Sequence, residues 1–443
     1  MHQREHESWT NSSINGDGLR PVGPLLRPER SRVVLRPFVP AEDGNASKEV
    51  KSRVERILER VTSLGQQQLS AELNRVLVSL SDRHANVEAI LQQRFRVLAE
   101  PHLDRLSVTP DQKLLVGACF TEEYSFEAAA LFNPCVVVHP DQSGLPKGTC
   151  RLLISLRAVG EGHVSSVSLR IALFDGMNLQ IDAPGALAPS PKIENIPGGE
   201  PNDPGVRLTY CDCDDQSQVV IFPVTYPQRH GIEDLRLTRF IDDDDEQVYL
   251  GTYTAFSGEG IRQELLRTTD FETFELNAIR GAQSATKGMA LFPRRIAGRY
   301  AMLGRHDHEN IWLLSSNDLY QWHEGEIIVS PRWPWEFIQM GNCGSPIEID
   351  EGWLVITHGV GPIRSYCLGA CLLDKKQPSK VLARSTEPII RPSPSTRDGY
   401  VPNVVYSCGG LVLGRTLLLP YSVADSFTAF ATTSVNDLLK TLN

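Results

Sequence analysis

Two carboxylates and an arginine stand close together at the start of a predicted strand. Glu233, Asp234 and Arg236 belong to the stretch GIEDLRLTRF, whose composition predicts a β-strand. A carboxyl group that faces a partly dry cavity beside a second carboxylate can hold its proton near neutral pH, as a general acid must. Taken alone, the pair is explained better by an ion pair with Arg236 or by a capped turn. The run from Asp242 to Asp245 that follows predicts a solvated loop.

A second group of chemically capable side chains is His306, His308 and Glu309 in the stretch GRHDHEN. Two histidines separated by one residue lie on the same face of a strand, as some metal sites require. No third partner stands at a recognisable spacing, so no metal is expected. Cys211 and Cys213 form a thiol pair without the second pair that a zinc site needs.

Two tryptophans flank a proline in the stretch PRWPWEF. An aromatic face can stack beneath a ligand ring, with hydrogen-bonding side chains around that ring. Trp333 and Trp335 are candidates for that face, and burial in the hydrophobic core is the alternative.

The composition limits the kinds of protein that can carry these residues. The chain has 443 residues, 41% apolar and 22% charged, as in a soluble globular protein. Its net charge of −10 argues against nucleic acid as a partner. No apolar run is long enough to cross a bilayer and no secretory signal is evident, so no membrane partner is expected. The nine scattered cysteines favour free thiols and a cytoplasmic location.

Three segments with different patterns must position the candidate residues. Residues 1–32 are polar and rich in Arg, Pro and Gly, which predicts a flexible leader. Within residues 33–105, apolar residues recur every three or four positions and predict a helical extension. These helices either pack on the rest of the chain or form an oligomer contact, and the sequence supports both equally. Residues 106–443 contain short β-rich runs between Gly, Pro, Asn and Asp turns, which predicts an antiparallel all-β domain.

An internal repeat narrows the all-β prediction. Asp270-Phe271 and Asp318-Leu319 are 48 residues apart, and each aspartate follows one predicted strand and precedes another. Asp175 and Asp437 mark fainter copies. A recurrence of forty to fifty residues over several short strands predicts the blades of a β-propeller. Propellers carry ligand groups on the loops between strands, so Arg157, near such a loop, is a candidate substrate contact.

Several motifs resemble glycoside hydrolase family 130, which contains β-mannoside phosphorylases and a smaller set of β-mannosidases. They occur in the family's order from about Leu131 to the C-terminus: GIEDLRLTRF, KGMALFPRRIAGRYAMLGR, GNCGSPIEIDEGWLVITHGV and GYVPNVVYSCG. The resemblance implies a five-bladed β-propeller with the active site at its central depression. It implies that Asp234 is the general acid, protonating the glycosidic oxygen through a sugar hydroxyl, although Leu235 replaces the usual proline. It also implies a sugar contact at Asn133, and Glu233 and Arg236 beside the acid are further candidate substrate contacts. With a sugar as substrate, the histidines of GRHDHEN are candidates for a sugar-binding rim and the two tryptophans for the aromatic face beneath the sugar.

The resemblance further implies a subsite for inorganic phosphate, the nucleophile of the phosphorylases. The matching positions hold Lys287, Arg305, His358 and Tyr366, and such cations and forked donors suit phosphate oxygens. Two expected groups differ, because glycine 288 replaces an asparagine and glutamine 339 replaces a lysine.

The loss of a cation slightly favours hydrolysis over phosphorolysis. An inverting hydrolase needs a base about 6.5 to 9.5 Å from its acid, and Glu309 is the candidate base, with an exposed turn residue as the alternative. The sequence therefore predicts a cofactor-free enzyme that cleaves terminal β-mannosides with inversion. The alternatives are a β-mannoside phosphorylase with phosphate as co-substrate and a carbohydrate-binding propeller without turnover. A homo-oligomer formed through the N-terminal helices is a further expectation.

Overall fold

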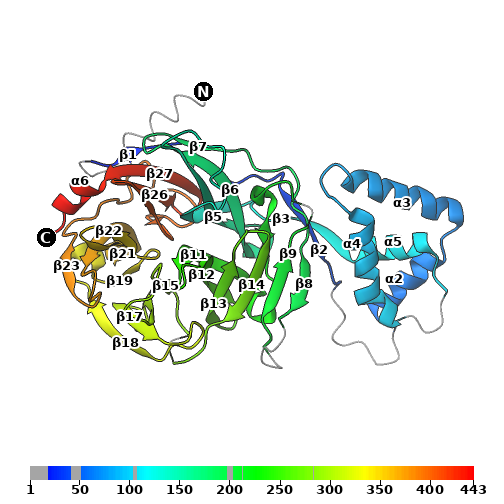
Figure 1. The fold of residues 1–443 in the computed structure, drawn as a ribbon. Coiled ribbons are helices and arrows are strands. Elements are labelled where there is room, and N and C mark those ends of the chain that lie inside the picture. The colour runs from blue at the N-terminus through cyan, green and yellow to red at the C-terminus, as the bar shows by residue number, and fades with distance from the viewer. Residues whose placement is uncertain (1–17, 41–50, 103–106, 197–202, 212, 283) are drawn as a thin grey trace. The chain divides into compact units, whose positions relative to one another are not determined.

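The computed structural model describes residues 18–40, 51–102, 107–196, 203–211, 213–282 and 284–443 (Figure 1). The chain divides into two compact units. The larger unit contains residues 127–184 and 191–443 together with the N-terminal segment up to Glu29, and the smaller unit contains residues 30–126 and 185–190. The larger unit consists mostly of strands, which confirms the all-β prediction for it.

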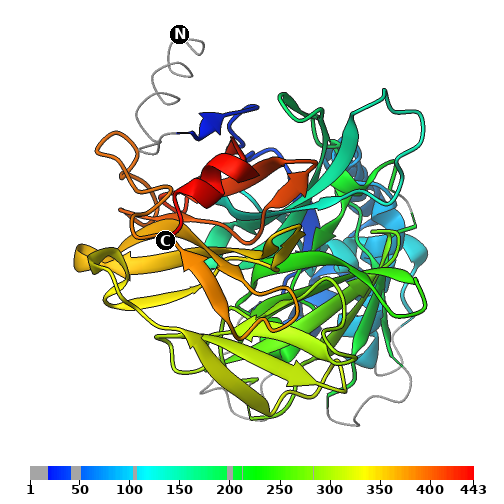
Figure 2. The same ribbon diagram turned by 60° about the vertical axis from the view of Figure 1, so that its left-hand side comes forward.

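Helices dominate the smaller unit, which also contains one two-stranded sheet (Figure 1; Figure 2 shows the same ribbon from another side). Its elements are β2 (Val33–Pro37), α2 (Arg53–Thr62), α3 (Gln66–Leu80), α4 (Val87–Arg94), η1 (Phe95–Ala99), η2 (Glu100–His102), α5 (Pro110–Cys119) and β3 (Thr121–Ser125). A capping box between Ser52 and Glu55 begins α2, because each side chain accepts the other's backbone N–H. Leu58, Leu69, Phe95 and Val116 belong to the unit's own core.

The helical part extends beyond the predicted boundary at residue 105. The run PDQKLLVGAC forms α5, although its apolar residues resemble a strand in composition. Thr109 and Gln112 form a capping box and Pro110 occupies the first turn, and this start signal outweighs the weak periodicity.

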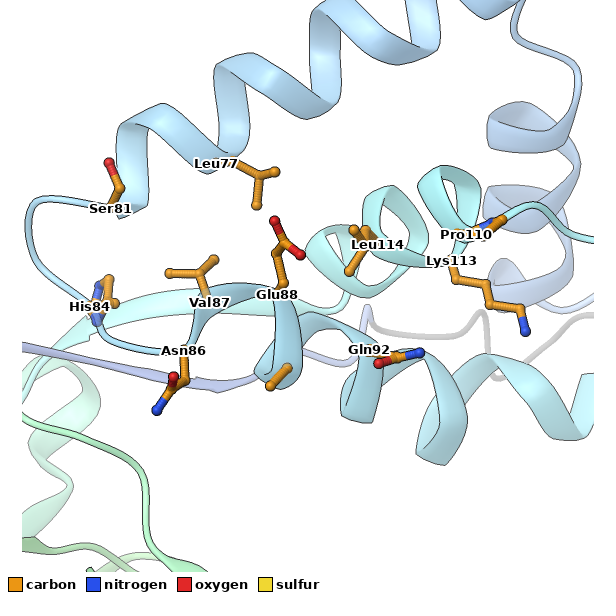
Figure 3. A pocket seen from close by; sticks show the side chains of 11 residues that line it. Leu77, Ser81, His84, Asn86, Val87, Glu88, Gln92, Pro110, Lys113 and Leu114 are labelled. Carbon is orange, nitrogen blue, oxygen red and sulfur yellow. The ribbon is translucent and has the colours of Figure 1, made fainter. Parts of the chain in front are cut away.

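A cavity of about 790 Å³ lies between three helices of this unit (Figure 3). Leu77 from α3, Val87 from α4 and Leu114 from α5 contribute apolar side chains, and Glu88 and Lys113 are among its polar ones. None of the candidate residues from the sequence lines this cavity.

The strands of the larger unit form four sheets, and within each sheet the strands lie side by side in the order in which they are named. The first contains β4 (Ala130–Val138), β5 (Cys150–Val159), β6 (Ser165–Phe174), β11 (Gly231–Ile241), β12 (Gln247–Phe256), β13 (Ile261–Thr268), β14 (Thr273–Ala278), β9 (Val206–Thr209) and β8 (Lys192–Asn195), with β7 (Leu179–Ile181) and β10 (Val220–Ile221) on β6. The second contains β15 (Ala290–Leu291), β16 (Tyr300–Gly304), β17 (Ile311–Ser316) and β18 (Glu324–Val329). The third contains β19 (Gln339–Asn342), β21 (Gly352–Gly361), β22 (Ser365–Leu373) and β23 (Val381–Arg384), with β20 (Ile347–Ile349) on β21. The fourth contains β1 (Arg20–Pro21), β27 (Phe427–Ser434), β26 (Thr416–Val423) and β24 (Val405–Tyr406), with β25 (Leu411–Leu413) on β26. Helix α6 (Val435–Lys440) follows β27.

The fourth sheet joins the two ends of the described chain. Arg20 and Pro21 pair with Thr432 and Ala431 of β27, and Leu26 forms a bridge with Thr428. This differs from the predicted flexible leader over residues 1–32, of which residues 1–17 lie outside the described residues. The backbone of this segment satisfies its hydrogen bonds at the free edge of β27, which explains why a polar composition alone mispredicted it.

The predicted repeat corresponds to one kind of turn. Asp270 lies between β13 and β14, and its side chain accepts hydrogen bonds from the backbone N–H groups of Glu272 and Thr273. Asp318 lies between β17 and β18 and accepts from the N–H of Tyr320. Aspartate closes such turns by bonding to the backbone two residues on, so the recurrence reflects a repeated strand–turn–strand unit.

The core of the larger unit consists of several apolar clusters. One includes Leu237, Tyr253 and Phe274 of the first sheet, and another includes Trp353 and Phe292. Among the residues described, no helix has the length and apolar character required to span a membrane.

Candidate active site

A cavity of about 170 Å³ in the larger unit collects residues from strands of the first, third and fourth sheets and from segments that connect strands. Its lining residues are Asn133, Arg157, Asp234, Lys287, Arg305, Arg364, Tyr366, Val401, Val404, Tyr406 and Asp425. Six of them were predicted from the sequence, although they are spread over more than two hundred positions. Each of these sheets therefore supplies only one or a few groups, and tertiary packing assembles the set.

Two bulges aim the central polar side chains into this cavity. Asn133 in β4 and Asp234 in β11 have φ angles of 48° and 56°, and the strand register shifts at both positions. Asparagine and aspartate tolerate this left-handed conformation better than most residues, and a bulge redirects a side chain out of its strand's alternation. The Asn133 amide donates to Asp234 Oδ1 at 2.7 Å, so the two bulges meet.

Asp234 and Glu233 lie in a network of cations. Arg157 donates to Glu233 Oε1 at 2.7 Å and to Asp234 Oδ1 at 3.3 Å. Lys287 Nζ lies 2.7 Å from Glu233 Oε2. Glu233 thus forms an ion pair with both cations, and Asp234 lines the cavity.

The surroundings of Asp234 differ from what the sequence predicted. Burial by itself would raise the pKa of this carboxyl, but Arg157, Arg236, Asn133 and Lys287 together lower it below its ordinary value. With these neighbours alone, Asp234 is therefore a carboxylate at neutral pH. The prediction that it holds its proton there is wrong, because the neighbouring carboxylate Glu233 is outweighed by nearby cations.

Arg305 contacts only neutral partners among the residues described. Its Nη1 lies 3.1 Å from His358 Nε2, and an arginine can only donate, so His358 accepts and is neutral. Burial, then Arg305 and Arg236, hold the pKa of His358 well below its ordinary value. With its amide oriented to satisfy both neighbours, Gln339 accepts from Arg305 Nη1 at 3.0 Å. Among the residues described, no carboxylate therefore pairs directly with this guanidinium at the cavity.

Sequence reasoning missed several of the lining residues, of which Asp425 is the most informative. It lies in the turn between β26 and β27 and has a φ angle of 48°. Burial, and then the Asp234 carboxylate, raise its pKa to about 7, while Arg157 and Arg364 oppose this rise. An aspartate in a turn between two apolar strands carries no distinguishing signal in sequence, so only the fold identifies it.

Arg236 and Tyr366 are two further predicted groups, and only Tyr366 lines the cavity. Arg236 is buried and donates to the Cys343 carbonyl and to Tyr406 Oη, both at 2.7 Å. Its charge lowers the pKa of Asp234. Tyr366 lines the cavity and stacks with His358 at a ring distance of 6.1 Å.

Six predicted site residues are not among the lining residues: Glu233, Arg236 and His358, which bond to lining residues, and Glu309, Trp333 and Trp335. Glu309 is exposed in the turn before β17, where its carbonyl accepts from Met340. Trp335 is buried, with its indole N–H donating to the Thr386 carbonyl, and it packs against Gly359. Trp333 is half-buried at the start of the short helix η6 (Pro334–Glu336). The interior position of Trp335 corresponds to the core alternative.

Within the described ranges, no group of three or more His, Cys, Asp or Glu side chains could hold a metal ion.

Known proteins resemble a large part of this chain. The profile of glycoside hydrolase family 130, described as beta-1,4-mannooligosaccharide phosphorylase, matches residues 211–443, just over half of the chain. The 1,2-beta-oligomannan phosphorylase of Thermoanaerobacter sp. (strain X514) is 33% identical over 219 residues, covering 48% of this chain and 72% of that protein. The beta-1,2-mannobiose phosphorylase of Listeria innocua is 32% identical over 231 residues, covering 50% of this chain and 63% of that protein. A solved structure of beta-1,2-mannobiose phosphorylase from Listeria innocua superimposes with a TM-score of 0.52 at 23% identity, covering 71% of this chain and 92% of that one.

Proposed function

The chain belongs to glycoside hydrolase family 130, and from this membership we propose that it is an inverting β-mannoside phosphorylase. It transfers the terminal mannosyl group of a β-mannoside to inorganic phosphate. The preference for hydrolysis inferred from the sequence is not supported, because the curated relatives are named as phosphorylases. In addition, Glu309, the expected base, is exposed and does not line the cavity.

The observation that carries this proposal is the charge of the cavity. Four cations line it, Arg157, Lys287, Arg305 and Arg364, against the two carboxyl groups Asp234 and Asp425. Arg305 in particular is held by a neutral imidazole and an amide. A cavity built for water as nucleophile has no need of uncompensated arginine, whereas phosphate requires it.

In the proposed reaction, a phosphate oxygen attacks the anomeric carbon on the face opposite the glycosidic bond. The bond from that carbon to the glycosidic oxygen breaks, and the oxygen receives a proton that originates on Asp234 and passes through a sugar hydroxyl. Inversion of a β-mannoside gives α-mannose 1-phosphate and a sugar shortened by one unit. Asn133, Arg157 and Tyr366 are the groups that we expect to hold the sugar and the phosphate in line.

Binding of phosphate also explains how Asp234 can be protonated and act as an acid, although its pKa is low in the cavity alone. A phosphate dianion beside Lys287, Arg157 and Arg305 offsets the positive charge that holds the carboxyl ionised. The pKa of Asp234 then rises towards the range in which it can act as a general acid. Asp234 is thereby protonated only when phosphate is bound.

Three of the curated relatives act on β-1,2-linked mannosides by name, and two on 4-linked ones. We therefore propose β-1,2-mannobiose and short β-1,2-oligomannosides as the first substrates to test. Inorganic phosphate is the co-substrate, and a cytoplasmic location and assembly through the N-terminal helices remain proposals.

The proposal for the fold is a five-bladed β-propeller. The supporting observation is that five runs of strands that neighbour one another along the chain pair within themselves: β4–β7, β11–β14, β15–β18, β19–β23, and β24–β27 with β1. The first two runs share one sheet only through the pairing of Gly231 with Ser165, and β8, β9 and β10 add to the edges of that sheet. The N-terminal strand β1 then completes the last blade, which ties the ends of the ring together.

Product analysis tests the proposed function. Purified protein is incubated with β-1,2-mannobiose, with and without inorganic phosphate, and products are identified by NMR. We expect α-mannose 1-phosphate only when phosphate is present, and a rate lowered by about 10²- to 10⁴-fold in Asp234→Asn. Free mannose formed at equal rates under both conditions would establish hydrolysis instead. Sugar binding without turnover in the wild type would favour the carbohydrate-binding alternative.

A further inference from the structure

Arg364 is a cavity residue to which neither the sequence motifs nor the reaction above assigns a role. It lies in η7 (Pro362–Arg364), the turn that joins β21 to β22. Its guanidinium carbon is 6.0 Å from the centre of the Tyr366 ring, and its charge acts on Asp425. The side chain is exposed, so Arg364 lies at the mouth of the cavity, whereas Arg305 is partly buried.

The turn that carries Arg364 has an unusual backbone. Ile363 and Arg364 have φ angles of 54° and 56°, and a left-handed conformation is a genuine outlier for a β-branched residue. Ile363 is 83% exposed, so burial of its side chain does not offset the strain. Strain of this kind persists where the surrounding structure enforces it, and functional sites are where it concentrates. Here the consequence of the turn is that Arg364 faces the cavity.

The partners of the four cavity cations differ. Arg157 pairs with Glu233 and Asp234, and Lys287 pairs with Glu233. Arg305 is bonded to neutral groups. For Arg364 the described part of the chain supplies no carboxylate within salt-bridge distance and no hydrogen-bond acceptor. Arg305 and Arg364 are thus the two cations whose charge is not already compensated by a direct pair.

We propose that Arg364 is a second arginine for the phosphate nucleophile and that it supplies the positive charge that position 339 lacks. This inference rests on the proposed function. A planar guanidinium presents paired donors that match two phosphate oxygens, and Arg305 and Arg364 hold the anion from the interior and from the mouth. Glutamine at position 339 is then no argument against phosphorolysis, because the cation comes from the turn between β21 and β22.

The test compares the Michaelis constants for the two substrates in three variants. In Arg364→Gln we expect the KM for phosphate to rise by about ten- to a hundredfold, because a charged hydrogen bond is lost. We expect the KM for β-1,2-mannobiose and the kcat at saturating phosphate to change by less than about threefold. Arg364→Lys keeps the positive charge but lacks the paired donors of a guanidinium. Its KM for phosphate should lie between those of the wild type and Arg364→Gln. Arg391→Gln is the matched control, since Arg391 is an exposed arginine paired with Glu387 and does not line the cavity.

Calorimetric titration with inorganic phosphate alone separates this inference from the proposed function. If the wild type requires phosphate for turnover and Arg364→Gln binds phosphate as tightly as the wild type, the inference is wrong and the function stands. If both Michaelis constants rise equally, Arg364 contacts the sugar and the inference is again wrong. If the wild type hydrolyses mannobiose without phosphate, the proposed function fails. If the glutamine variant does not fold, comparison of the phosphate titrations of the wild type and Arg364→Lys still decides whether Arg364 binds the anion.

Discussion

Two carboxyl groups in one small cavity respond to their surroundings in opposite directions. The pKa of Asp234 is lowered, chiefly by Arg157 and Arg236 acting against its burial. The pKa of Asp425 is raised to about 7 by burial and by the charge of Asp234. Pairs of titratable groups whose surroundings move their pKa values apart are typical of acid–base sites. Asp425 is therefore the group in the cavity whose charge changes near neutral pH.

Asp425→Asn is expected to remove a pH dependence of phosphate binding. Below pH 7 the wild-type carboxyl is protonated and resembles asparagine, and above pH 7 it is a carboxylate that repels phosphate. We expect the ratio of the variant's phosphate affinity to that of the wild type to be near one at a pH about one unit below 7. At a pH about one unit above 7, this ratio should be roughly five to ten. Calorimetry with inorganic phosphate measures this ratio, from which the ionisation of phosphate itself cancels. A ratio independent of pH would contradict the raised pKa.

At the scale of elements, short irregular segments aim the side chains that the strands carry. The bulges in β4 and β11 turn Asn133 and Asp234 towards each other, and the turn at Ile363 brings Arg364 to the same cavity. These segments hold non-glycine residues in the left-handed region, and this strain lowers the free energy of unfolding.

The strain at Ile363 predicts an unusual effect of glycine. Ile363→Gly should leave the free energy of unfolding unchanged or raise it by about 1 kcal/mol, since relief of the left-handed conformation outweighs the added entropy of the unfolded chain. The matched control is Ile327→Gly in the edge strand β18, where the isoleucine is also exposed but extended. This control should lose about 1 kcal/mol. Urea unfolding of both variants measures the difference, and an equal loss in both would show that Ile363 is unstrained.

At the scale of the whole molecule, the helical unit has a core of its own. Residues such as Leu58, Phe95 and Phe120 pack with one another. In this unit α4 and α5 approach closely at Gly117, where an added Cβ would lie 2.0 Å from the Leu91 carbonyl oxygen. The family profile begins at residue 211, so this unit lies outside the matched region.

Gly117→Ala tests whether the two units unfold separately. Alanine favours an isolated helix over glycine, but the clash with Leu91 should destabilise the helical unit by about 1–3 kcal/mol. Calorimetry is expected to resolve two transitions, with only the smaller one lowered, by roughly 5 °C or more. Gly65→Ala is the control, because nothing lies within 4 Å of the added atom. A single transition that shifts as a whole would contradict independent unfolding.

The sequence by itself determined the class of the fold and a large part of the cavity. Alternating short apolar runs between turns specify antiparallel strands, because pairing of neighbouring segments depends on local pattern. The repeated aspartate turns were visible for the same reason. Motif matches identified Asn133, Asp234, Lys287, Arg305 and Tyr366, and the structure brings all five to one cavity.

The tertiary structure decided what depends on distant neighbours. The ionisation of Asp234 follows from Arg157, seventy-seven positions away, and from Lys287, so no local pattern could reveal it. Arg364 and Asp425 carry no motif of their own, and only the packing of separate sheets places them in the same cavity as Asp234. Trp335 and Glu309 show the converse, since their residue types suited a sugar site but their positions did not. Charge and burial act through space, and sequence reports them only where the neighbours in space are also neighbours in the chain.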